Sequence, residues 1–72
     1  MPKLRQIKPK ELVKILKNKG FVQGRREGSH ISMINYSNGA RTVVAMHNRE
    51  IPKGTLMAIL RESGLSKDDL TS

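Results

Sequence analysis

The chain has 72 residues and a net charge of +8, with 14 Lys and Arg against six Asp and Glu. We expect one domain over residues 1–72, close to the smallest size at which a single core supports folding. The absence of cysteine excludes thiol chemistry, disulfides and Cys-based zinc sites, and the two histidines have no flanking carboxylate cluster, so neither a metal nor another cofactor is expected. No apolar run has the length of a signal peptide or a membrane span, so we expect a cytoplasmic protein.

The first periodic segment is residues 9–19, whose spacing predicts a helix. The apolar residues on one face of this helix are Leu12, Val13, Ile15 and Leu16. The residues on the opposite face are Lys10, Lys14 and Lys17. Pro9 suits the first helical turn, and Gly20 suits the position just past the end of the helix.

Residues 21–47 have the pattern of extended chain. A first strand begins at Phe21, and Gly28 marks a turn. The second strand runs through residues 31–34, and a third, rich in β-branched residues, spans residues 41–47. This region is therefore expected to form three consecutive antiparallel strands.

Helical spacing returns in residues 54–63 through Leu56, Ile59 and Leu60, and Gly64 ends the run. Ser66 and Asp69 are spaced to cap one further short turn. The element order is α-β-β-β-α. We therefore expect an α+β fold in which two helices cover one face of a three-stranded antiparallel sheet.

Asn38-Gly39 lies between the second and third strands and is the strongest short-range hairpin signal in the chain. A two-residue turn places Ser37 opposite Ala40, and a four-residue loop over residues 37–40 gives the same register. The strand pairing is thereby predicted for the whole hairpin.

In this register Ile31 faces Met46 in the core, and His30 faces His47 on the other side of the sheet. A slip of one residue would move one histidine to the opposite face and spoil the apolar match. We therefore expect both imidazoles to share one site.

The tripeptide Gly28-Ser29-His30 places a titratable imidazole at the start of a rigid strand, on a chain whose charge favours phosphate backbones. Cleavage of RNA by its own 2′-hydroxyl needs a base of near-neutral pKa, a proton donor and positive charge on the phosphate. In this interpretation His30 is the general acid or base, and His47 is a second proton-transfer group. The alternative for each is an exposed strand histidine without a chemical role.

Candidate RNA-binding residues are Arg25, Arg26, Arg41, Lys53, Gly54 and Thr55. The last three open the second helix, where free backbone N–H groups and the helix dipole can hold a phosphate; an ordinary helix start is the alternative. Phe21 and Tyr36 are the only aromatic residues besides histidine, so reading of RNA shape or backbone is favoured over an aromatic platform for bases. An anionic membrane surface is disfavoured as partner because no segment has a large apolar face with Trp or Phe.

The whole chain resembles the HicA (YcfA-like) family of toxins from prokaryotic toxin–antitoxin pairs. The matching stretches are Lys10-Glu11-Leu12, Lys19-Gly20-Phe21, Gly28-Ser29-His30, Val44-Ala45-Met46-His47, Gly54-Thr55-Leu56, Ile59-Leu60 and Gly64-Leu65-Ser66. They cover nearly all of the chain in order and spacing. The family often has Pro at the position of Ala45 and a second histidine at that of Ile31; neither departure touches His30.

The resemblance implies a fold like that of double-stranded-RNA-binding domains. It also implies an mRNA interferase, a metal-independent endoribonuclease that arrests translation, with His30 as its catalytic residue. A HicB-type antitoxin would bind the toxin and cover this site, and we expect the free toxin to be a monomer. The alternatives are a non-catalytic double-stranded-RNA-binding module and a DNA-binding regulator, the latter disfavoured because no recognition-helix motif is evident.

Overall fold

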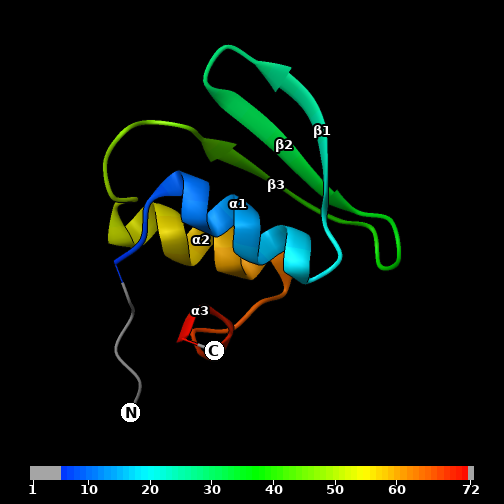
Figure 1. Ribbon diagram of the computed structural model, residues 1–72. Coiled ribbons are helices and arrows are strands. Elements are labelled where there is room, and N and C mark those ends of the chain that lie inside the picture. Colours follow the sequence, from blue (N-terminus) through cyan, green and yellow to red (C-terminus); the bar gives the residue numbers. More distant parts are fainter. Residues whose placement is uncertain (1–5, 72) are drawn as a thin grey trace.

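The computed structural model describes residues 6–71 and confirms the predicted α+β fold with the order α-β-β-β-α (Figure 1). The elements are α1 (Pro9–Asn18), β1 (Val22–Glu27), β2 (His30–Asn35), β3 (Ala40–Ala45), α2 (Lys53–Ser63) and a short α3 (Asp68–Thr71). Within the described part of the chain, no helix is both long and apolar enough to span a membrane.

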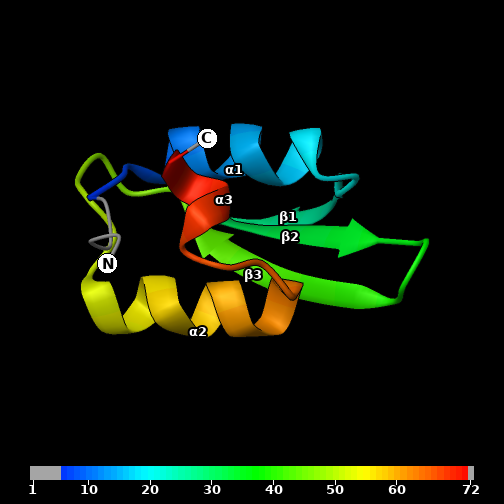
Figure 2. The same ribbon diagram turned by 90° about the horizontal axis from the view of Figure 1, so that it is seen from below.

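The three strands form one antiparallel sheet in the order β1-β2-β3. Both long helices lie on the same face of this sheet, and the opposite face is open (Figure 1). Helix α1 packs against β1 and β3, and α2 runs alongside β3 (Figure 2). We call the uncovered side the open face; on β2 and β3 it carries His30, Ser32, Ile34, Arg41 and Val43.

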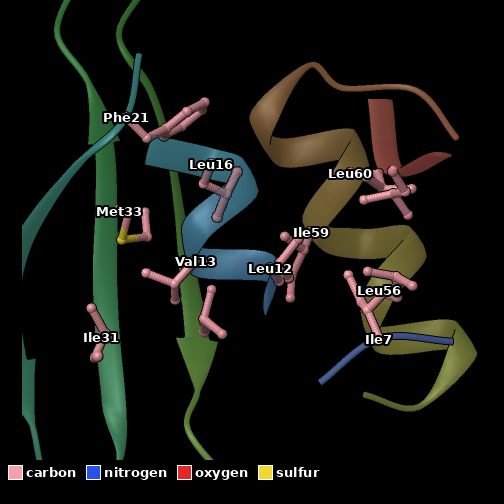
Figure 3. Packing of buried hydrophobic residues seen from close by; sticks show 12 residues of the cluster. Ile7, Leu12, Val13, Leu16, Phe21, Ile31, Met33, Leu56, Ile59 and Leu60 are labelled. Carbon is pink, nitrogen blue, oxygen red and sulfur yellow. The ribbon is translucent and has the colours of Figure 1, made fainter. Parts of the chain in front are cut away.

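The core lies between the sheet and the helices and is apolar (Figure 3). Its most deeply buried side chains come from every layer of the fold, and they include Leu12, Leu16, Met33, Val44 and Leu56. Burying one such side chain stabilises the fold by about 1.5–3 kcal/mol, so the alternation of buried residues in β2 and β3 fixes which face of these two strands meets the helices.

Glycines end both long helices as the sequence predicts. Gly20 (φ 98°) follows α1, and the Phe21 N–H then donates to the Leu16 carbonyl oxygen at 3.0 Å. Gly64 (φ 73°) follows α2, and the Leu65 N–H donates to the Leu60 carbonyl oxygen at 3.0 Å. These positive φ values are where glycine relieves strain, and the hydrogen bonds satisfy carbonyls that the helix end leaves free.

The predicted cap at Ser66 and Asp69 is confirmed, and Asp69 also links α3 to the end of α1 through Lys19. A carboxylate oxygen of Asp69 accepts hydrogen bonds from the Ser66 backbone N–H (2.8 Å) and hydroxyl (3.3 Å). The other oxygen lies 3.1 Å from the Lys19 ammonium. The Ser66 N–H, and after it Lys19, lower the pKa of Asp69 below its usual 3.8. Leu70 is fully buried in the core beside this contact.

The predicted register of the β2–β3 hairpin is wrong by two residues. Asn35, not Ser37, closes the hairpin opposite Ala40, and the loop is residues 36–39. His30 consequently lies opposite Ala45 instead of His47.

Two asparagine side chains explain this loop. The Asn35 carboxamide oxygen accepts the Ser37 N–H (2.9 Å), and that of Asn38 accepts the Ala40 N–H (2.8 Å). Asn35 is buried and its Nδ2 approaches the Lys19 carbonyl oxygen at 3.5 Å, which ties the hairpin to the end of α1. Because the difference is an even number of residues, every side chain keeps the face that the sequence predicted for it.

Candidate active site

His30 is the first residue of β2 and lies on the open face. A two-residue turn, Gly28-Ser29, precedes it, so Glu27 at the end of β1 pairs directly with His30. Gly28 has φ 60°, the conformation that a type II′ turn requires at its first central position. The tight turn therefore fixes the backbone from which the imidazole projects.

His30 lines a pocket of about 280 Å³ to which all three strands contribute. Its other lining residues are Arg25, Glu27, Ser32 and Val43. Arg25 and Glu27 approach to 3.8 Å, but both side chains are more than three-quarters exposed, so this ion pair is weak and screened. The Arg25 guanidinium is thus accessible to a phosphate bound beside His30.

A bulge in β1 separates the roles of its two arginines. The pairing of β1 with β2 shifts between Gln23 and Arg26, and such bulges re-aim side chains. Arg25 lines the His30 pocket, whereas the Arg26 Nε–H donates to the Gly28 carbonyl oxygen at 3.0 Å. Of the two predicted phosphate-binding arginines in β1, Arg25 therefore borders the candidate active site, and Arg26 hydrogen-bonds to the turn that positions His30.

His47 does not share the His30 pocket. Strand β3 ends at Ala45, and the Met46 N–H donates to the Ser29 carbonyl oxygen at 2.6 Å. His47 follows in the loop before α2 and lines a separate pocket of about 250 Å³. The prediction that the two histidines face each other fails because it rested on the hairpin register corrected above.

The remaining predicted RNA-binding residues lie on the open face and at the start of α2. Arg41 and Thr55 line a wide hollow of about 610 Å³ between the outer side of β3 and α2. Lys53 and Gly54 are exposed in the first turn of α2. The N–H groups of this turn face outward from a helix whose N-terminus favours anions.

The three hollows are neighbours, because adjacent ones share lining residues. Ser32 and Val43 border both the His30 pocket and the Arg41 hollow. Thr55 and Ile59 border both the Arg41 hollow and the His47 pocket. We call this series of hollows, from His30 through Arg41 to His47, the track.

Sequence reasoning missed Glu27 as a member of the site. The only indication in the sequence is that Glu27 directly precedes Gly28-Ser29. If these two residues form a two-residue turn, Glu27 pairs with His30. Across residues 6–71, no three side chains of the His, Cys, Asp or Glu type are grouped as ligands for a metal ion.

No curated protein matches the chain. The family model described as the HicA toxin of bacterial toxin–antitoxin systems matches residues 9–65, which include every strand, both long helices and His30. The chain therefore belongs to the HicA toxin family, the toxins of bacterial toxin–antitoxin systems.

Proposed function

We propose that this toxin is an endoribonuclease of the mRNA interferase type, which cleaves mRNA and so arrests translation. The observation that carries the proposal is the placement of His30: a tight turn holds it in a pocket on the open face, with Arg25 at its border, in a chain of net charge +8. A histidine for proton transfer and a planar cation at one phosphate are two of the three groups that RNA cleavage without a metal requires.

The proposed reaction is an internal transfer at phosphorus. The ribose 2′-oxygen forms a bond to the phosphorus while the bond to the 5′-oxygen of the next nucleotide breaks. One proton leaves the 2′-hydroxyl, and one is delivered to the departing oxygen. His30 carries out one of these transfers and solvent water the other, and Arg25 neutralises the charge that develops on the non-bridging oxygens. The products are a 2′,3′-cyclic phosphate and a 5′-hydroxyl end.

The open face also fits the second part of the proposal, a HicB-type antitoxin as partner. The His30 pocket is uncovered in the isolated chain, which we propose to be a monomeric single domain. An antitoxin that occupies this pocket would exclude RNA from it. The family supports an antitoxin partner in general terms, and the covered surface is our proposal.

The deciding experiment incubates the purified toxin with a defined RNA in the presence of a chelator, beside His30→Ala. We expect cleavage by the parent, a loss of at least about 100-fold in the variant, and RNA binding by both. An RNA with a single 2′-deoxy substitution at the cleaved position is the matched control, because it lacks the attacking hydroxyl and should remain intact.

A non-catalytic RNA-binding module is the second candidate, since the charge and fold serve it equally well. Equal binding by the parent and by His30→Ala, without cleavage by either, would establish that alternative. Cleavage that disappears with chelator would contradict the metal-independent mechanism.

A further inference from the structure

We propose that the His47 pocket binds one nucleobase of a single-stranded RNA whose cleaved phosphate lies at His30, and that His47 is a binding residue. The inference rests on the proposed function for naming RNA as the ligand. It replaces the predicted role of His47 in proton transfer.

The pocket has the composition of a base site. Its inner wall includes three buried apolar residues, Pro9, Val44 and Ile59. Its rim carries the exposed polar side chains of His47, Arg49 and Thr55. An apolar floor with a few polar groups at the mouth holds a flat ring and fixes its orientation. At about 250 Å³ the pocket is smaller than the sites of drug-sized ligands, which suits a single ring system.

The track supplies the route for the backbone between the two pockets. Cationic side chains border it at intervals: Arg25 beside His30, Arg41 in the middle and Arg49 at the far end. Beyond His47 a further hollow, which shares Pro9 and His47 with the base pocket, is bordered by Lys8 and Lys10. A strand of phosphates that follows the track therefore meets one arginine in each of its three hollows.

Acidic side chains also border the track. Glu27 faces Arg25, and the Glu62 carboxylate accepts the Thr42 hydroxyl at 2.7 Å. Glu50 lines the base pocket itself. A carboxylate there repels phosphate but accepts hydrogen bonds from the amino groups of bases, so it favours a base over a phosphate as the occupant.

A base pocket of this kind requires that the bound RNA be single-stranded. A base can enter it only when it is unpaired and unstacked, whereas an A-form duplex keeps its bases inside the helix. Sequence reasoning disfavoured a base platform because few Phe, Tyr and Trp residues are present. His47 supplies a planar ring that this count leaves out.

The test compares His47→Phe with His47→Ala in steady-state cleavage of a single-stranded RNA. Phenylalanine keeps a planar ring but cannot transfer a proton. We expect His47→Ala to raise KM about tenfold, in the range of lost base stacking, with its main effect on KM and not on kcat, and His47→Phe to recover most of that loss. A His47→Phe variant as inactive as His30→Ala would overturn the inference, as would a His47→Ala variant that lowers kcat at unchanged KM.

A binding measurement separates this inference from the proposed function. The His30→Ala variant should bind RNA without cleaving it, so binding can be measured in this variant directly. Adding His47→Ala to it should weaken the binding of a single-stranded oligonucleotide about tenfold. A duplex of the same sequence should compete poorly. Unchanged affinity, or equal competition by the duplex, overturns the base pocket even if the toxin is a ribonuclease. The expected loss supports the pocket even if cleavage is never seen.

Charge-matched variants control for general electrostatics. Arg49→Gln and Lys14→Gln each remove one positive charge, but only Arg49 borders the pocket, whereas Lys14 is exposed on α1. We expect the loss of affinity with Arg49→Gln to exceed clearly that with Lys14→Gln. Equal losses would mean that only net charge matters, which overturns the site.

Discussion

The two faces of β2 differ in what their residues do: alternate residues of this one strand either pack in the core or line the candidate site. Ile31 and Met33 face the helices and are buried, whereas His30 and Ser32, on the neighbouring positions, line the hollows of the open face. The covered face holds the fold together, and the open face carries His30 and Arg25, the groups that we assign to RNA cleavage. Neighbouring residues should therefore respond to substitution in opposite ways, one through stability and the other through chemistry.

The largest expected effect on stability is at Met33. Met33→Ala removes a fully buried side chain and should lower the free energy of unfolding by about 2–5 kcal/mol, measured by denaturant titration. The neighbouring Ser32→Ala should change it by no more than about 0.5 kcal/mol. A comparable loss of stability in both variants would contradict the conclusion that the covered face, and not the open face, stabilises the fold.

A substitution at Gly28 should affect both stability and chemistry, because the turn that contains Gly28 positions His30. Gly28→Ala places a side chain at φ 60° and should cost about 1–2 kcal/mol of stability, with reduced cleavage as His30 moves. Gly54→Ala is the matched control: no atom lies within 4 Å of its added methyl group, and φ there is not positive. Its effect should be neutral or stabilising by up to about 1 kcal/mol. Thermal unfolding of both variants measures the contrast.

Thr42 is a buried polar residue of the covered face, and it can be compared with the exposed Thr55. Its buried hydroxyl donates to the Glu62 carboxylate at 2.7 Å, so Thr42→Val should cost about 1 kcal/mol while the shape is kept. Thr55→Val, at an exposed hydroxyl on the track, should change stability by less than about 0.5 kcal/mol. If the two losses measured by chemical denaturation are equal, the Thr42–Glu62 bond contributes nothing to the fold.

The smallest effect concerns α3 and pH. The pKa of Asp69 is lowered in the folded chain, so its contribution is fully present above the unfolded value of 3.8 and is lost as pH falls through the folded pKa. Asp69→Asn should remove this component of the acid dependence and loosen α3 at neutral pH. Amide hydrogen exchange at Leu70 reports the loosening, with the amides of β2 as an internal reference. Equal protection in parent and variant would exclude the contact as a fastening of α3.

The element order could be predicted because local signals agree with the tertiary structure. Pro9, Gly20 and Gly64 mark helix ends by their backbone preferences, and the Ser66–Asp69 cap is a local hydrogen bond. The faces of β2 could be predicted because burial of Ile31 and Met33 admits only one parity. These features depend on residues close together in the chain or on burial alone.

The register and the composition of the site could not be predicted in the same way. Two hairpin registers that differ by two residues put the same side chains in the core, so hydrophobic patterning cannot distinguish them. The choice depends on Asn35, whose side chain reaches both the loop and the end of α1. The bulge in β1 that brings Arg25 beside His30 likewise depends on cross-strand pairing.

The hydrogen bond from Met46 to Ser29 has a consequence for the sequences that this strand can accept. Hydrogen-bonded and non-hydrogen-bonded pairs alternate in an antiparallel ladder, so the neighbouring pair, Ala45 with His30, is of the second kind. The Ala45 N–H therefore points away from β2, and β3 is an edge strand. Proline, which the family often has at this position, would remove a donor that the ladder does not use. Such a substitution would stiffen the strand directly across from the histidine while leaving every bond to β2 intact.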